Sequence, residues 1–283
     1  MTVVLAFLVG LLVVLALEAG GREVLARPVL ARRNYRDHEL ATAAGLLLVV
    51  AVVLVEGART VIELLGASDG ATAPDRLLVV AVVVAFGTLG LIDDVLGDDA
   101  EKGLAGHVRA ALHGRITTGA IKLAGGASFA LVAAAVLGAD RPVQTIVDAA
   151  LIALAANLAN LFDRAPGRTI KVGLLAWAPL AIVAGTSAAG LAVAVVAGGA
   201  AGLLRADLAE RSMIGDTGAN ALGAGLGVAA VLVLGPGARA VVAAILLALT
   251  LASEVVSFSR VIDRTPPLRA ADRLGRRRPE AGG

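Results

Sequence analysis

The chain has 283 residues, of which 58% are hydrophobic and 17% are charged, and its formal charge is +2. Because soluble domains are about 45–50% apolar and about 25% charged, this composition argues against a soluble enzyme and against a disordered chain. The chain contains no cysteine, which excludes disulfides, thiol catalysis and thiolate metal sites. Its basic residues are spread over short segments with few aromatic residues nearby, so we expect no nucleic-acid partner.

The apolar residues fall into charge-free runs, and such runs predict membrane-spanning helices because a span needs roughly 20 mostly apolar residues. The first run has no basic segment before it, so it is interpreted as an uncleaved helix and not as a signal peptide. The run 172–204 is too long for one span at about 1.5 Å per residue, and Gly185, Thr186 and Ser187 predict a turn near its middle. The other runs are 1–17, 40–55, 77–92, 123–139, 149–162, 217–238 and 240–253.

The sequence therefore predicts an all-α, polytopic integral membrane protein with about nine transmembrane helices. Because successive helices enter from alternating sides, all but four of the 25 lysines and arginines fall on one side. Cytoplasmic loops are enriched in these residues, so we expect the N-terminus outside and the C-terminus in the cytoplasm. We also expect a transmembrane domain over 1–259 and a basic cytoplasmic tail over 260–283, which would contact anionic lipid.

The first polar cluster in chain order is Asp93-Asp94, which ends the run 77–92 and is followed by Asp98 and Asp99. Adjacent carboxylates repel each other, and a charge in a membrane span is costly. A divalent cation would relieve both costs, and Mg²⁺ prefers carboxylate oxygens while keeping waters that substrate phosphates can replace. The alternative is a solvated helix end, where acidic residues are common.

The second cluster is Asn157-x-x-Asn160-x-x-Asp163, at the end of the run 149–162. Steps of three residues place the three side chains within an arc of about 120° on one helix face. Amides and a carboxylate in a membrane helix usually face a cavity or a neighbouring helix. The cluster predicts either a pocket for a polar ligand or hydrogen bonds between helices.

The third cluster is Gly215-Asp216-Thr217-Gly218, at the start of the run 217–238. The glycines allow unusual backbone angles, and Asp216 or Thr217 would cap the helix that follows. A helix start also favours anions such as phosphate. A cap alone is the alternative, but the predicted topology places all three clusters on one membrane face, where acids, amides and basic residues would converge.

In this order, the three clusters resemble the polyprenyl-phosphate N-acetylhexosamine-1-phosphate transferases, which include phospho-MurNAc-pentapeptide translocase and GlcNAc-1-phosphate transferases. The stretch from Asn34-Tyr35-Arg36 to Gly45 resembles the family's first cytoplasmic loop and second helix start. The resemblance implies a multi-pass enzyme of the bacterial plasma membrane. Such an enzyme transfers a phospho-sugar from a UDP-N-acetylhexosamine-type donor to polyprenyl (undecaprenyl) phosphate and releases UMP, for peptidoglycan or another cell-wall glycopolymer. It also implies homodimers.

The same resemblance implies roles for particular residues. Asp93 and Asp94 are the candidate catalytic residues, with Asp93 as a base toward the lipid phosphate. Asp216 and Asp94 would bind Mg²⁺ or, in its place, Mn²⁺. The substrate-binding residues would be Asn157, Asn160, Asp163, Arg109 and Lys102.

Phosphoryl transfer depends on positioning and charge neutralisation more than on covalent work by the protein, which agrees with these residue types. The chain departs from the family in two motifs. Its histidines, His38, His107 and His113, all lie early, so the late His-rich motif of the translocases is missing. The usual Asp-Gly after the Asn/Asp cluster is replaced by Arg164-Ala165-Pro166-Gly167-Arg168. Two alternatives stay open. One is a non-catalytic relative that binds polyprenyl phosphate or a lipid-linked sugar as an envelope-assembly partner, and the other is a lipid flippase or transporter, whose small residues would allow mobile helix packing.

Overall fold

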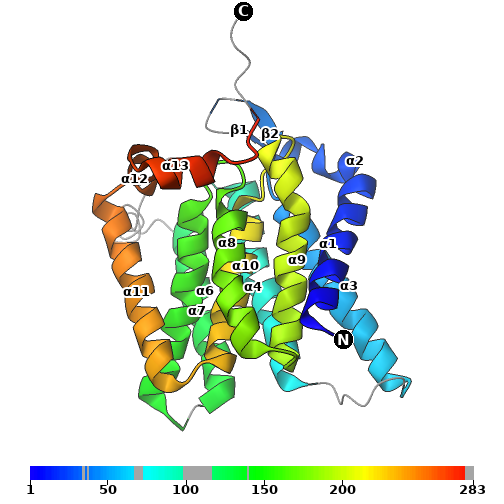
Figure 1. Ribbon diagram of the computed structural model, residues 1–283, viewed down its shortest axis with the longest axis vertical. Helices are drawn as coiled ribbons and strands as arrows, with labels where there is room; N and C mark the ends of the chain where they lie inside the picture. The colour runs from blue at the N-terminus through cyan, green and yellow to red at the C-terminus, as the bar shows by residue number, and fades with distance from the viewer. Residues whose placement is uncertain (34–35, 37, 67–72, 98–116, 139, 278–283) are drawn as a thin grey trace, which may run out of the picture.

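The long helices of the chain run alternately in opposite directions, as the computed structural model shows (Figure 1). The structure describes residues 1–33, 36, 38–66, 73–97, 117–138 and 140–277. Within these residues, eight helices are long and apolar enough to cross a membrane, which confirms the prediction of a helical, multi-pass membrane protein. The eight are α1 (Val3–Gly20), α3 (Gly45–Leu64), α4 (Pro74–Leu96), α6 (Thr118–Gly138), α7 (Pro142–Phe162), α9 (Ala188–Leu208), α10 (Gly215–Val233) and α11 (Pro236–Val255).

The long apolar run that the sequence divides in two is also divided in the structure, into α8 (Arg168–Ala184) and α9. Helix α8 ends at Gly185, whose φ of 53° lies in the region that favours glycine. Ser187 then caps α9, because its hydroxyl accepts a hydrogen bond from the amide of Gly190 at 3.1 Å. Helix α8 has 17 residues and contains Pro179, so it is shorter than the eight helices above.

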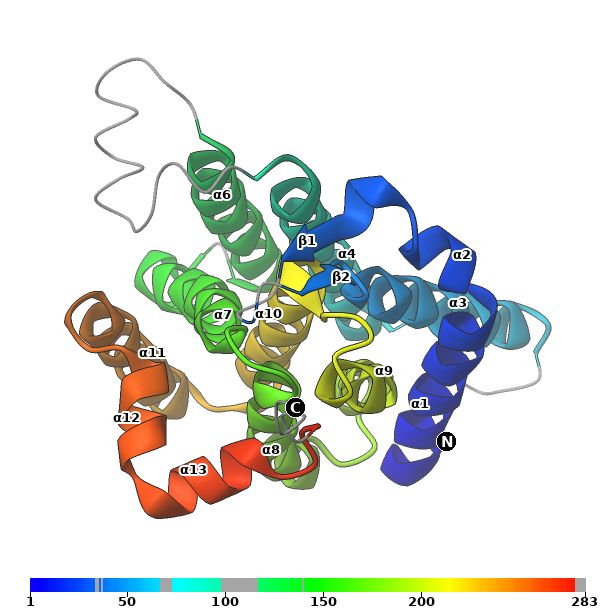
Figure 2. The same ribbon diagram turned by 90° about the horizontal axis from the view of Figure 1, so that it is seen from above.

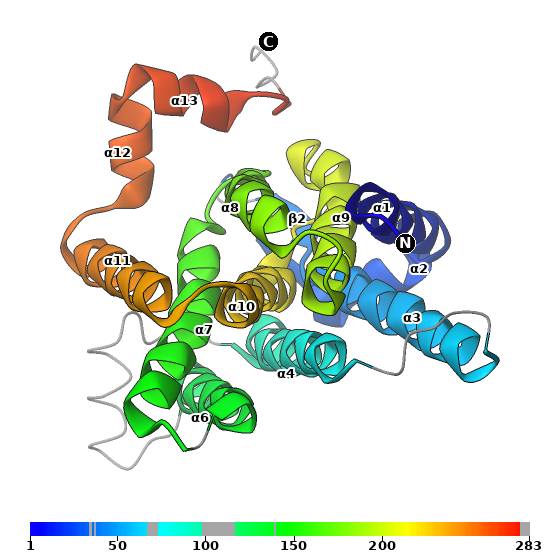
Figure 3. The ribbon, with the colours of Figure 1, turned by 60° about the horizontal axis from the view of Figure 1, so that its bottom comes forward.

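Helices α9 and α10 form the centre of the bundle, whereas α1 and α11 lie at its edges (Figure 3). In the most apolar stretch of α10, 83% of the residues are buried inside the protein, against 6% in α11. Small residues allow membrane helices to approach closely, and a Cβ added at Gly45 of α3 would overlap the backbone of Gly218 in α10. A Cβ at Gly90 of α4 would overlap the backbone of Asp216. The start of α10 is therefore pressed against α3 and α4.

One end of the bundle carries the short elements, and we call this end the hairpin face. Strands β1 (Ala31–Arg33) and β2 (Glu39–Ala41) pair antiparallel there. Helices α12 (Phe258–Arg264) and α13 (Pro266–Arg273) lie across the ends of the long helices (Figures 1 and 2). The expected boundary between the transmembrane domain (1–259) and the basic tail (260–283) falls inside α12. The short helices α2 (Arg22–Leu25) and Pro28–Leu30 connect α1 to β1.

Candidate functional site

Four polar side chains from four helices meet at the hairpin face, and we call them the aspartate site. They come from the last turn of α4, the beginning of α6, the last turn of α7 and the first turn of α10. Helices α4, α6, α7 and α10 lie next to one another when the molecule is seen from above this face (Figure 2). The four residues are Asp93, Lys122, Asn160 and Asp216.

The ammonium group of Lys122 lies between the two carboxylates of the site. Its Nζ donates to Oδ2 of Asp93 at 3.2 Å and to Oδ2 of Asp216. In the amide orientation that satisfies both neighbours, Asn160 donates to Oδ1 of Asp216 at 2.6 Å and accepts from Lys122 at 2.9 Å. The side chains of Asp93 and Asp216 are 22% and 27% exposed, so the site is open on one side. Carboxylate and amide oxygens therefore surround one cationic group.

Helix α10 begins in a conformation that holds Asp216 in place. Gly215, its first residue, has a φ of 66°, which an L side chain rarely adopts, and a Cβ there would lie 2.7 Å from a carboxylate oxygen of Asp94. The amide of Gly45 donates to the carbonyl of Ile214 at 2.9 Å, which joins the start of α3 to the start of α10. Glycine at position 215 is thus required by both backbone angle and space.

Asp94 lies beside the aspartate site but faces the start of α10. Its carboxylate accepts hydrogen bonds from the amides of Asp216 and Thr217 at 3.1 and 2.9 Å. It also accepts from the hydroxyls of Thr42 and Thr217 at 3.1 and 2.6 Å. A carboxylate offers about four acceptor positions, and these four donors fill them. Asp94 therefore caps α10 from a neighbouring helix and has little capacity left for a metal ion.

The polar stripe expected on α7 continues inward from the aspartate site. A cavity of about 60 Å³ lies between α4, α6, α7 and α10, and its polar lining comes from Lys122, Asn157 and Asn220. The side-chain nitrogen of Asn157 reaches the hydroxyl of Thr250 on α11 only at 3.5 Å. The side-chain nitrogen of Asn220 is buried without a hydrogen-bond partner among the described residues. These amides extend the site toward the middle of the bundle.

Asp163 lies at the edge of the site, just after the last turn of α7. Its amide donates to the carbonyl of Asn160 at 3.0 Å, which ends the helix. Burial raises the pKa of the Asp163 carboxyl well above its usual range, and the nearby charges of Asp207 and Asp216 raise it further. The structure thus places Asp163 within electrostatic reach of Asp216.

Lys122 is the residue of the aspartate site that the sequence does not single out. A lone lysine just before the apolar run 123–139 is its only sequence signal. The two basic residues expected to bind substrate, Lys102 and Arg109, lie outside the described residues. Within the described residues, no group of three or more His, Cys, Asp or Glu side chains is arranged to hold a metal ion.

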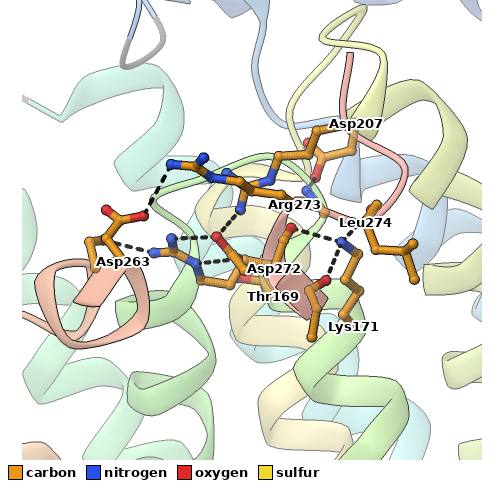
Figure 4. Close-up of polar contacts among 12 residues, drawn as sticks. Thr169, Lys171, Asp207, Asp263, Asp272, Arg273 and Leu274 are labelled. Carbon is orange, nitrogen blue, oxygen red and sulfur yellow. Dashed lines mark hydrogen bonds and ion pairs between the residues drawn. The ribbon is translucent and has the colours of Figure 1, made fainter. Parts of the chain in front are cut away.

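A second polar cluster fastens α12 and α13 to the start of α8, and Figure 4 shows its contacts. The guanidinium of Arg168 donates to both carboxylate oxygens of Asp272, at 2.8 and 3.1 Å, and to the hydroxyl of Ser259 at 2.7 Å. Lys171 donates to the carbonyls of Asp272 and Leu274 at 2.9 and 2.6 Å. Burial alone would raise the pKa of Asp272, but the hydrogen bonds and charge of Arg168 outweigh it and hold that pKa below its usual range.

No protein-family model matches the chain, and a search of curated proteins finds no relative of it. What the site does is therefore inferred from its own residues and their geometry.

Proposed function

We propose that the protein is a transferase that moves a phospho-sugar from a UDP-N-acetylhexosamine-type donor to polyprenyl phosphate and releases UMP. The observation that carries this proposal is the meeting of Asp93, Lys122, Asn160 and Asp216 at one end of a multi-pass bundle. A lipid acceptor and a water-soluble donor meet at such a position, next to the membrane and open to solvent. The concentration of lysine and arginine at the hairpin face favours a cytoplasmic location for it, in a bacterial plasma membrane.

Asp93 and Asp216 are the residues that would hold Mg²⁺ or Mn²⁺. Mg²⁺ is usually bound through one or two carboxylates, with waters and substrate phosphates in its other positions, and these two side chains supply that donor set. Asp94 suits the ion less, because four hydrogen bonds already occupy its oxygens. When bound, the ion supplies positive charge to the phosphate oxygens.

The other residues of the site would bind and orient the substrates. Lys122 has the charge and the reach to neutralise a substrate phosphate, which is the main task in phosphoryl transfer. Asn160 fixes the orientation of Asp216, and Asn157 and Asp163 would face the nucleotide-sugar. The second pKa of a phosphate monoester is about 6, so the lipid phosphate is largely ionised at neutral pH. Little proton abstraction is then required of Asp93.

One observation favours a second candidate, a non-catalytic protein that binds polyprenyl phosphate. The ammonium of Lys122 already lies between Asp93 and Asp216, so a positive charge balances the carboxylates without a metal ion. Such a protein would bind the lipid phosphate but leave UDP-sugars intact.

The test uses purified protein in detergent with Mg²⁺, undecaprenyl phosphate and, in turn, UDP-GlcNAc, UDP-GalNAc and UDP-MurNAc-pentapeptide. We expect release of UMP that requires both the lipid and Mg²⁺, and the productive sugar would identify the pathway. Folded protein that binds undecaprenyl phosphate but releases no UMP from any of the three donors would contradict the transferase and favour the second candidate.

A further inference from the structure

A pocket of about 750 Å³ opens on the hairpin face between the α7–α8 turn and the tail helices α12 and α13. Seen from above, α8, α12 and α13 border this region (Figure 2). The pocket shares no lining residue with the aspartate site. We call it the arginine pocket, because its lining includes Arg36, Arg164, Arg168, Arg273, Arg276 and Arg277.

Carboxylates balance only part of this charge. Arg168 and Arg276 share one partner, Asp272, at 2.8 and 2.5 Å. Arg273 reaches Asp263 only at 3.8 Å. Among the described residues, Arg164 has no acidic group within 4.0 Å. These four guanidinium groups therefore face two carboxylates, while Arg36 pairs with Glu210 at 3.1 Å.

One guanidinium that lines the pocket also keeps an unsatisfied donor. The Nε of Arg276 is buried and has no hydrogen-bond partner among the described residues. Buried polar groups are nearly always hydrogen-bonded, and an unsatisfied one is destabilising. This donor is closed to solvent, so a ligand in the pocket would act on it through the charge of the guanidinium and not by a direct hydrogen bond.

Hydrogen bonds to uncharged groups hold the pocket walls in place. Arg168 donates to the hydroxyl of Ser259. Lys171 donates to the carbonyls of Asp272 and Leu274 (Figure 4). These contacts fix the tail without adding negative charge. Guanidinium groups bind phosphate oxygens in a bidentate manner, and pockets of 300–1,000 Å³ are typical for small-molecule ligands.

We propose that the arginine pocket binds a phosphate-bearing ligand with two or more negative charges. The ligand is either a soluble phosphate compound or the headgroup of a lipid that enters beside α12 and α13. This inference does not depend on the transferase proposal, because the pocket and the aspartate site are lined by different residues.

The test measures binding of inorganic pyrophosphate, by calorimetry, and of a short-chain phosphatidic acid to the full-length protein in detergent. Matched short-chain phosphatidylcholine is the lipid control. The variant Arg164→Gln/Arg273→Gln removes two charges from the pocket. Arg260→Gln/Arg264→Gln removes the same charge from α12 residues that do not line it. The single variant Arg164→Gln breaks no described ion pair, so it keeps the test valid if the double variant misfolds.

We expect one saturable site for pyrophosphate or for phosphatidic acid, and the probe that binds identifies the source of the phosphate. The pocket variant should bind that probe about tenfold or more weakly, which corresponds to about 1.4 kcal/mol, while the α12 variant should bind as wild type does. Asp216→Asn should also leave this binding unchanged, whatever its effect on UMP release. The proposal is overturned if neither probe binds the folded protein, or if the pocket and α12 variants lose affinity equally.

Discussion

The two ends of the bundle differ in how their buried charges are matched. At the end away from the hairpin face, Arg76 is 1% exposed and pairs with Glu63 at 2.6 Å and with Glu56 at 3.4 Å. Arg239 and Asp148 pair there at 2.9 Å. These groups lie among the ends of α3, α4, α7 and α11, and each charge has a partner of the opposite sign on the same or a neighbouring helix.

At the hairpin face, the charges are unequal within each cluster. The aspartate site places two carboxylates on one ammonium group, and four of the six guanidinium groups that line the arginine pocket face two carboxylates. Matched buried charges join helices, because removing one partner leaves the other unpaired. Unmatched charges also attract ions of the opposite sign. We therefore propose that local charge excess, more than the presence of polar residues, marks the candidate ligand sites.

The largest expected effect concerns the aspartate site. Asp93→Asn and Asp216→Asn should each lower UMP release at least about 100-fold, because each removes a carboxylate that would hold the metal ion against the transferred phosphate. The measurement is the rate of UMP release by purified protein. Asp75→Asn, an exposed change at the other end of α4, is the matched control and should keep the wild-type rate. Full activity in both site variants would show that the reaction requires neither aspartate.

The second largest effect is expected when the matched ion pairs at the end away from the hairpin face are disrupted. Arg76→Met should destabilise the protein by about 3–5 kcal/mol, because it leaves Glu63 without its buried partner and Glu56 with Arg59 alone. Denaturant unfolding in detergent measures the change. The rate of UMP release per folded molecule should stay at the wild-type value. A large loss of that rate in folded Arg76→Met protein would mean that the matched network also serves the reaction.

The third effect separates the two neighbouring aspartates. Asp94→Asn should destabilise the protein by about 2 kcal/mol, since an amide nitrogen would face the N–H and O–H donors at the start of α10. Hydrogen exchange at residues 215–218 should become faster. Asp93→Asn, one residue earlier, should change stability less. If Asp93→Asn proved the more destabilising of the two, the capping role of Asp94 would be wrong.

The smallest effect concerns the tail. Asp272→Asn should lower the free energy of local opening of α12 and α13 by an amount on the order of 1 kcal/mol, because it weakens the hydrogen bonds with Arg168. Hydrogen exchange in these two helices should therefore become faster. The pKa of Asp272 is lowered in the folded protein, so its stabilising contribution is complete above the ordinary aspartate pKa. That contribution is lost as the pH falls through the lowered value. Acid-induced loosening of the tail should therefore occur in wild type and be absent from the variant, and identical pH profiles would refute this assignment.

Local patterns predict several features that the structure contains. The break between α8 and α9 follows from Gly185 and Ser187, whose backbone angle and cap are properties of a short segment. The shared position of Asp93, Asn160 and Asp216 follows from the alternation of the helices, because each residue lies at the end of an apolar run that reaches the same side.

The features that the sequence does not predict depend on packing between distant segments. Lys122 reaches the carboxylates because α6 packs against α4 and α7, which no local pattern shows. Asp93 and Asp94 are about 100° apart around a helix, and only the placement of α10 determines that Asp94 is the one that caps it. The pairing of Arg168 with Asp272 joins residues 104 positions apart. Local sequence patterns therefore do not predict that α13 is attached to the start of α8.

The most direct test of charge excess at the aspartate site measures Mn²⁺ binding by electron paramagnetic resonance. The measurement compares wild-type protein with the double variant Asp93→Asn/Asp216→Asn. We expect wild type to bind one Mn²⁺ ion that Mg²⁺ displaces, and the double variant to bind none, while Asp75→Asn behaves as wild type. Folded wild-type protein that binds no Mn²⁺, or a double variant that binds it as well as wild type does, would contradict the account.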